Sequence, residues 1–501
     1  MQVNKFCGYL SLSFLSGTIA VFAFAPFNLS FIILISILGL LFSFYKSSAS
    51  AFKIGYSYGI GFFAIQIYWL FYSLYFIIKA GSLIASLTML LATLYLALYP
   101  ALALYLYKKY KTNYELFNLM LLFPSIWVLL EWLRGWFFLN GYPWSDIGYT
   151  QVDNYLSHGY FRVIGEYGVS WLSISIIGTV FYLLYFKRNF RISIFYIIMI
   201  LIAGYALSAI KYTYPNGEIT SVALVQPNIL GDEKWGHRNH LDLFLAVVQD
   251  THADIIFLPE TGIADFAGNL PKGYMSQLES YAKMHNSDLF VGLPIVINSN
   301  NDYVNAIQLV TESGQPYYAK YHLVPYGEYI PLKKSFAWLY KKINLPMVGF
   351  SSGLERQEPI KVKNQKIAFN ICYENGFANE VIAAAKNATL LANISDMAWF
   401  GNTIAMNQHL QLSQARAIEN QRYFIQETNT SITALINPDG KLIASLQPFT
   451  RGVLKGNVEG MVGTTLYQKL GNYPIIILCC LIVGYALIFR RRQRQKVVLN
   501  F

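Results

Sequence analysis

The feature that most limits how this chain can fold is a series of long apolar runs. Eight of them approach the length of about 20 residues that a helix needs to cross a bilayer. Only 13% of all residues are charged, well below the share in soluble domains. We therefore expect a multi-span α-helical membrane domain of about eight helices. The runs are residues 8–27, 30–45, 54–78, 83–107, 115–134, 161–186, 191–210 and 471–489.

Basic residues follow every second run, which gives the helices an orientation. Because cytoplasmic loops are enriched in Lys and Arg, both termini are expected in the cytoplasm and the long segment before the last run outside it. In a bacterium this is the inner membrane, with the segment in the periplasm. If one short run does not cross, part of the order is reversed. The basic residues are Lys46, Lys53, Lys108, Lys109, Lys111, Lys187, Arg188, Arg191, Arg490, Arg491, Arg492, Arg494 and Lys496.

The predicted domains follow from these runs. Residues 1–212 form the membrane domain with seven helices, residues 216–465 an outer domain, residues 471–489 the eighth helix and residues 490–501 a basic cytoplasmic tail. A loop at about 134–160 is rich in Trp and Tyr, which favour the membrane interface. We expect it to lie on the bilayer beside the outer domain, and a simple aromatic belt is the alternative.

The outer segment differs from the rest in charge. Residues 216–465 contain 22 of the 27 acidic residues and 19 of the 38 basic ones, so the net positive charge of the chain lies beside the apolar runs. This is the pattern of membrane orientation and not the basic surface of a nucleic-acid-binding protein. Helical patterns at 237–251, 272–286 and 404–421 lie between short β-branched runs, and a late hairpin turns at Pro438-Asp439-Gly440. The runs are "ITSVALVQPN", "DIIFLPET", "SDLFVGLPIV", "YVNAIQLV", "KIAFNICYE", "ATLLANIS" and "SITALINPDGKLIASL". An α/β fold is predicted.

Three residues of the outer segment suggest chemistry. Cys372 is its only cysteine, in a compartment that permits disulfides, so it is a candidate nucleophile. Glu260 ends the apolar run "DIIFLPE", and Lys320 lies in a β-like stretch before a turn. A thiol needs a base, and a reaction at a carbonyl needs a donor for the oxyanion. The alternative is that Glu260 and Lys320 are ordinary charges at strand ends.

The stretches around these residues resemble a known superfamily. "FLPET", "KYHLVPYGEYIP" and "NICYENGF" are similar to the nitrilase, or carbon–nitrogen hydrolase, superfamily and its Glu-Lys-Cys triad. "HLVPYGEYIPL", "NISDMAWFG", "QHLQLSQARAIENQR" and "EWLRGW" with "GYPW" resemble its membrane-embedded branch, the apolipoprotein N-acyltransferase family. The resemblance covers nearly the whole chain and implies an αββα sandwich for the outer domain.

The resemblance also implies a reaction. A fatty acyl chain would pass from a glycerophospholipid, usually phosphatidylethanolamine, through a thioester on Cys372 to the N-terminal amine of an apolipoprotein whose cysteine carries a diacylglyceryl group. Glu260 would be the base and Lys320 would stabilise the oxyanion. By motif, Glu328, Tyr373 and Glu374 would support the active site, while Trp235 and Trp399 would lie at lipid-binding positions. Salt bridges are the plainer interpretation of Glu328 and Glu374, and packing is that of the two tryptophans.

No metal or cofactor is expected, because the seven histidines show no metal-ligand spacing and no glycine-rich phosphate loop is found. Two other functions stay open. One is a membrane-anchored amidase with water as the acceptor, and the other is a catalytically dead lipid-binding scaffold or transporter. The intact set Glu260, Lys320 and Cys372 argues against the scaffold, and the flanking motifs favour transfer to an amine.

Overall fold

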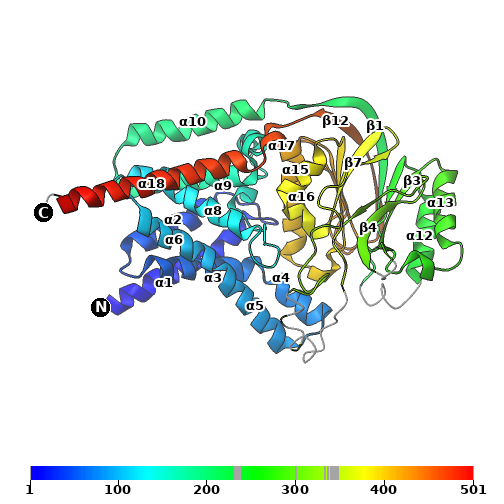
Figure 1. The fold of residues 1–501 in the computed structure, drawn as a ribbon, viewed down its shortest axis with the longest axis horizontal. Coiled ribbons are helices and arrows are strands. Elements are labelled where there is room, and N and C mark those ends of the chain that lie inside the picture. The colour runs from blue at the N-terminus through cyan, green and yellow to red at the C-terminus, as the bar shows by residue number, and fades with distance from the viewer. Residues whose placement is uncertain are drawn as a thin grey trace.

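The chain forms a helical bundle and an αββα sandwich that lie end to end (Figure 1). The computed structural model describes residues 2–230, 239–298, 302–331 and 349–499, together with Ser335 and Trp338. The termini of the described chain lie at the end of the bundle that is remote from the sandwich. The expected fold class, membrane helices followed by an α/β sandwich, is confirmed.

Each predicted apolar run lies on helices of the bundle. The first seven runs fall before the sandwich and the eighth after it, as the sequence predicts. The helical segments are α1 (Gln2–Ile19), η1 (Ala20–Ala23), α2 (Ile32–Lys46), α3 (Ala51–Gln66), α4 (Trp69–Tyr72), η2 (Ser73–Ile77), α5 (Ser82–Leu96), α6 (Leu98–Tyr110), α7 (Glu115–Phe117), η3 (Asn118–Leu122), α8 (Phe123–Arg134), η4 (Ile147–Gln151), α9 (Tyr155–Phe186), α10 (Phe190–Ser208), α17 (Leu466–Leu470) and α18 (Tyr473–Leu499).

The helices differ in whether they can span a bilayer alone. Within the described residues, five stretches are long and apolar enough, and the bent pair Ala51–Gln66 and Trp69–Ile77 is a sixth. The first two predicted runs form shorter apolar helices, Cys7–Ala23 and Ile32–Lys46, which pack together with Ser36 donating to the Ser16 carbonyl at 2.7 Å. The count of eight spans therefore stays a prediction.

Glycines allow the central helices of the bundle to touch. A Cβ at Gly17 would lie 2.1 Å from the carbonyl oxygen of Tyr58, and one at Gly55 would lie 2.4 Å from that of Pro100. Small residues at such crossings let backbones approach closely, which is how helices associate when lipid removes the hydrophobic driving force. The contacts hold α1, α3 and α6 together.

The sandwich contains two six-stranded sheets. The first has the order β12-β1-β2-β3-β4-β5 and the second β11-β10-β9-β8-β7-β6. In each sheet three neighbouring strands are parallel, β1-β2-β3 and β7-β8-β9, and the flanking strands are antiparallel. The strands are β1 (Thr213–Gln226), β2 (Ile255–Phe257), β3 (Asp288–Val296), β4 (Tyr303–Leu309), β5 (Tyr317–Ala319), β6 (Ile360–Val362), β7 (Gln365–Ile371), β8 (Leu390–Ser395), β9 (Phe424–Thr428), β10 (Ala434–Ile436), β11 (Leu442–Ser445) and β12 (Gly452–Gly463).

Helices cover the outer face of each sheet. Helices α12 (Asn239–Asp250) and α13 (Tyr274–Met284) pack on the first sheet at the far end of the molecule. Helices α15 (Ala378–Ala385) and α16 (Ile404–Asn420) pack on the second sheet and face the bundle (Figure 1). Apolar side chains of both sheets, such as Phe257, Phe290 and Phe369, fill the space between them. The short 3-10 turns η5 (Ala267–Asn269), η6 (Cys372–Gly376) and η7 (Met397–Phe400) complete the domain.

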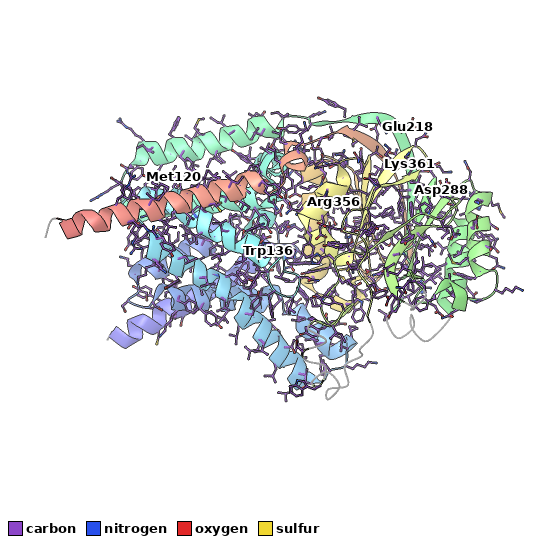
Figure 2. The ribbon with its side chains drawn as sticks, in the orientation of Figure 1. Met120, Trp136, Glu218, Asp288, Arg356 and Lys361 are labelled. Atoms are coloured by element: carbon purple, nitrogen blue, oxygen red, sulfur yellow. The ribbon has the colours of Figure 1, made fainter. Side chains whose placement is uncertain are left out.

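The aromatic loop before α9 is exposed in one part and buried in another. Trp136, Phe137 and Phe138 are about half exposed, and Trp136 lies at the end of the bundle that faces the sandwich (Figure 2). Residues 142–152 are instead largely buried, and Trp144 and Tyr149 belong to one apolar core with residues of α16. Protein covers them, because α16 offers apolar contacts that the sequence did not reveal, and the place of the loop beside a bilayer stays a prediction.

Candidate active site

The three predicted catalytic residues follow three different strands. Glu260 lies just beyond β2, Lys320 directly after β5 and Cys372 directly after β7. Strands β2 and β7 belong to the parallel strands of the two facing sheets. Ligand sites of α/β proteins lie beyond the carboxyl ends of such strands. The sandwich therefore brings together residues that are 60 and 52 positions apart in the chain.

Lys320 lies between two carboxylates. Its Nζ donates to Glu260 Oε1 at 3.2 Å and to Glu328 Oε1 at 2.8 Å. The amide of Asn305 donates to the same two oxygens, at 2.7 Å and 3.0 Å. The Lys320 side chain is only 1% exposed and Glu260 only 7%. A buried charge of this kind is stable only when it is paired and hydrogen-bonded, as it is here.

The second oxygen of Glu260 accepts the backbone N–H of Asp396 at 2.7 Å, which fixes the carboxylate. Burial raises the pKa of Glu260, and the charge of Lys320 opposes this only in part. For Lys320, burial alone would lower the pKa, but Glu260 and Glu328 together raise it well above its ordinary value. The site thus holds a carboxylate with an increased affinity for a proton beside a permanent cation.

Cys372 has an unusual backbone. Its φ is +53°, in the left-handed region, and it begins the turn η6. The side chain is 8% exposed. Burial raises the pKa of the Cys372 thiol well above its ordinary value, the charge of Glu260 raises it further, and Lys320 lowers it. The thiol is therefore protonated at neutral pH and needs a base to become a nucleophile.

Comparison with known proteins identifies the family. Residues 16–179 match the apolipoprotein N-acyltransferase N-terminal domain, and residues 221–467 match the carbon-nitrogen hydrolase family. An apolipoprotein N-acyltransferase of Chromobacterium violaceum is 36% identical over 488 residues, which cover 96% of this chain and 94% of that protein. The chain belongs to the apolipoprotein N-acyltransferase family. With its apolar helices, it is a bacterial membrane protein.

Two further members of the apolipoprotein N-acyltransferase family agree over most of the chain. The protein of Neisseria meningitidis is 39% identical over 456 residues, covering 87% of this chain and 88% of its own. The protein of Nitrosomonas europaea is 34% identical over 490 residues, covering 95% and 97%. The similarity thus extends through the bundle and the sandwich together.

Glu374 connects η6, the turn that begins at Cys372, to the stretch that contains Lys320. Its two carboxylate oxygens accept four hydrogen bonds, from the backbone N–H groups of Ile371, Tyr321 and His322 and from the hydroxyl of Tyr318. Burial raises the pKa of Glu374 to about 7, and the charge of Glu380 adds to this while backbone N–H groups oppose it.

The neighbouring Tyr373 reaches the bundle. Its hydroxyl donates to the Gly141 carbonyl at 2.8 Å, and its ring stacks on Trp144 with centroids 6.4 Å apart. The two predicted support residues on this turn therefore act on different partners. Glu374 connects to the Lys320 stretch and Tyr373 to the loop before α9.

Of the two tryptophans predicted at lipid-binding positions, the structure describes only Trp399. Trp235 lies outside the described residues. Trp399 is 40% exposed in η7, and its carbonyl oxygen accepts the hydroxyl of Ser73 from the bent helix pair at 2.6 Å. The structure therefore brings Trp399 to the junction of sandwich and bundle.

Sequence reasoning missed residues that contact the three candidate catalytic ones. Asn305 touches both carboxylates, while Asn393 and His409 donate to the Cys372 carbonyl at 3.1 Å and 3.2 Å. Asn305 and Asn393 are polar residues inside apolar strands, "VNAIQL" and "LLANIS", which was the available signal. Among the described residues no group of three or more His, Cys, Asp and Glu side chains is arranged to hold a metal.

Proposed function

We propose that this chain transfers a fatty acyl chain from a membrane glycerophospholipid to the N-terminal amine of S-diacylglyceryl-cysteine in apolipoproteins, through a thioester on Cys372. The donor we propose is phosphatidylethanolamine. The observation that supports this most is the buried contact of Lys320 with Glu260, in electrostatic range of the Cys372 thiol. The names of the family relatives supply the acceptor class.

The first half-reaction forms the thioester. Glu260 takes the proton of the Cys372 thiol, and the thiolate attacks the carbonyl carbon of the phospholipid ester. The Lys320 ammonium stabilises the oxyanion of the tetrahedral intermediate. The ester C–O bond then breaks, Glu260 returns the proton to the departing oxygen, and lysophospholipid leaves.

The second half-reaction uses the acceptor amine. The neutral amine attacks the thioester carbonyl, and Glu260 takes a proton from its nitrogen. The C–S bond breaks, an amide is formed, and the proton returns to Cys372. Such a cycle is ping-pong, since the first product leaves before the second substrate reacts. Glu328 and Asn305 keep Lys320 and Glu260 in place through both steps.

The proposed arrangement in the membrane is based on the two ends of the bundle, one next to the sandwich and one with both termini. We assign residues 1–212 and 471–489 to the membrane, residues 216–465 to a periplasmic catalytic domain and residues 490–501 to a cytoplasmic tail. The basic loops favour cytoplasmic termini. The position of both termini away from the sandwich supports the same orientation (Figure 1).

The test begins with the purified protein and phosphatidylethanolamine without acceptor. Intact-protein mass spectrometry should show the mass of one fatty acyl chain, released by hydroxylamine and missing in Cys372→Ala. Adding a diacylglyceryl peptide should then yield its amide. Folded protein without an acyl adduct would overturn the proposal in favour of the scaffold. An adduct that only hydrolyses, with no amide when the peptide is present, would identify an amidase-like hydrolase.

A further inference from the structure

The carbonyl group of Cys372 is held by two buried side chains. Asn393 Nδ2 donates to it at 3.1 Å and His409 Nε2 at 3.2 Å, and both side chains are fully buried. Asn393 belongs to β8, next to β7, whereas His409 comes from α16, which faces the bundle. A non-glycine residue in the left-handed region persists only where its surroundings hold it there. These two donors are contacts of the Cys372 peptide itself, and they help to hold it there.

The proton of His409 has one position that fits this contact. Burial lowers the pKa of His409 to about 4, and the Cys372 carbonyl opposes this shift while Lys320 adds to it. The ring is therefore neutral at neutral pH and carries a single N–H. Because a carbonyl oxygen only accepts, that N–H is at Nε2. Nδ1 is buried and has no hydrogen-bond partner among the described residues.

A tryptophan from the bundle side packs against this ring. Trp144 lies between α8 and α9, and its ring stacks on that of His409 with centroids 6.1 Å apart and planes inclined by 28°. The Trp144 indole N–H donates to Gln408 Oε1 at 2.9 Å, and Gln408 in turn donates to Gln66 of α3 at 2.5 Å. Trp144 is thus bonded to α16 itself and is linked through Gln408 to α3 of the bundle.

The same loop also contacts η6, the turn that begins at Cys372. The carbonyl of Gly141 accepts the Tyr373 hydroxyl at 2.8 Å. Pro143 packs so closely on Gly376 that a Cβ there would lie 3.1 Å from its ring. Residues 141–144, which we name the clamp segment, therefore touch both Tyr373, the next residue after Cys372, and His409, which bonds the Cys372 carbonyl.

We propose that His409 is a positioning residue for Cys372, and that Trp144 of the clamp segment makes this position depend on the helical bundle. His409 does not need to meet substrate. It fixes the left-handed backbone that aims the thiol at Glu260. The relevance of this inference to acyl transfer rests on the proposed function. The position of the thiol itself can be tested without any lipid.

The test compares three variants of the full-length protein by the rate at which iodoacetamide alkylates Cys372, followed by peptide mass spectrometry. His409→Leu removes the donor, and we expect alkylation to slow at least about tenfold, since small misplacements of a reacting group have effects of this size or more. His409→Gln keeps an N–H near the Nε2 position and should recover most of the rate. His158→Leu is the matched control, because His158 is a buried histidine that bonds the Val152 carbonyl, away from Cys372.

A double-mutant cycle separates positioning from general loss of structure. In the wild-type background Glu260→Gln should slow alkylation strongly. In the His409→Leu background the same change should have little further effect, because the thiol no longer faces the carboxylate. Equal effects of Glu260→Gln in both backgrounds, or equal rates for His409→Leu and wild type, would overturn the proposal.

If His409→Leu does not fold, His409→Asn replaces it, because its amide falls short of the carbonyl while the side chain stays polar. The proposal then requires Gln to react faster than Asn, and equal rates for the two contradict it. Trp144→Leu should also slow alkylation of Cys372. Combined with the His409 variant, it should not lower the alkylation rate further. A failure of the acyl-adduct test would leave these alkylation results unaffected, so the two proposals can fail separately.

Discussion

At the residue scale, we expect the proposed base, Glu260, to set the pH dependence of thioester formation. Glu260 must be a carboxylate to accept the thiol proton, and burial raises its pKa above the ordinary 4.5. The rate of adduct formation should therefore fall as the pH falls through a midpoint above 4.5. Because the pKa of Lys320 is also raised, its charge should persist on the alkaline side. Rates of adduct formation between pH 4 and 9 would measure this, and a midpoint at or below 4.5 would contradict it.

Glu374 should link stability to pH. Burial raises its pKa from 4.5 to about 7, so the folded state prefers the protonated form. This contribution to stability is complete below pH 4.5 and is lost as the pH rises through about 7, with a limit of about 3 kcal/mol.

Glu374→Gln removes that titration. The difference in Tm between wild type and variant should therefore shrink from pH 5 to pH 8, as thermal unfolding in detergent would show. A difference that stays constant or grows over this range would show that Glu374 is ionised in the folded protein throughout.

The sequence made the triad residues visible for a physical reason. Glu260, Lys320 and Cys372 are polar or reactive side chains that interrupt β-like runs, and loops after strands hold most sites. His409 gave no comparable signal, because an imidazole within a helix is usually satisfied by its neighbours, and Asn393 showed only as a polar residue inside an apolar strand. Their role depends on the left-handed backbone of Cys372, and a cysteine in a sequence does not predict that conformation.

At the element scale, β3 passes against the chain that carries the base. A Cβ added at Gly292 in β3 would lie 2.1 Å from the Pro259 carbonyl oxygen and 2.9 Å from the Glu260 Cα. Gly292→Ala must therefore push residues 259–260 aside. We expect thioester formation to slow by about a hundredfold through the displaced base, measured as the initial rate of adduct formation.

Gly268→Ala is the matched control for Gly292→Ala, because a Cβ at Gly268 would meet nothing within 4 Å. It should leave both the rate and the Tm unchanged. If Gly292→Ala also kept the wild-type rate, the approach of β3 to Glu260 would be too loose to position the base.

Elements were predictable where their pattern was local. The run "KIAFNI" gave β7 and the turn at Pro438-Asp439-Gly440 gave the β10–β11 hairpin, where Gly440 has φ +78°. Strands β9 and β12 were missed, since "FIQET" and "GVLKGNVEGMVG" carry many polar residues. Their pairing with β8 and β1 makes them strands, and such long-range contacts override local propensity.

At the scale of the whole molecule, a buried ionic cluster joins the bundle to the sandwich. Arg416 of α16 lies 2.9 Å from Glu419 and 3.7 Å from Glu166 of α9, and it donates to the Tyr149 hydroxyl at 2.8 Å. Arg416→Met would leave two buried carboxylates without their cation. Breaking such a cluster costs about 3–5 kcal/mol, so we expect a clear fall in Tm.

The control for Arg416→Met is Lys283→Met, which breaks the exposed pair of Lys283 with Glu279 on α13. An exposed pair contributes about 0–1 kcal/mol, so this variant should unfold close to wild type. Similar Tm values for both variants would show that the cluster does not hold the two parts together.

The pairing of β1 with β12 has a consequence for how the molecule is made. Thr213 and Gly463 face each other across the sheet, so the two chain connections to the bundle leave it side by side. In the proposed periplasmic placement of residues 216–465, β1 is synthesised first, and one of its edges stays unpaired until β12 has also crossed the membrane. Helix α18 then follows and packs on α8 and α9. The ribosome thus synthesises the last helix only after the closing strand of the sandwich, and in the proposed orientation the sandwich must cross the membrane before the membrane part is complete.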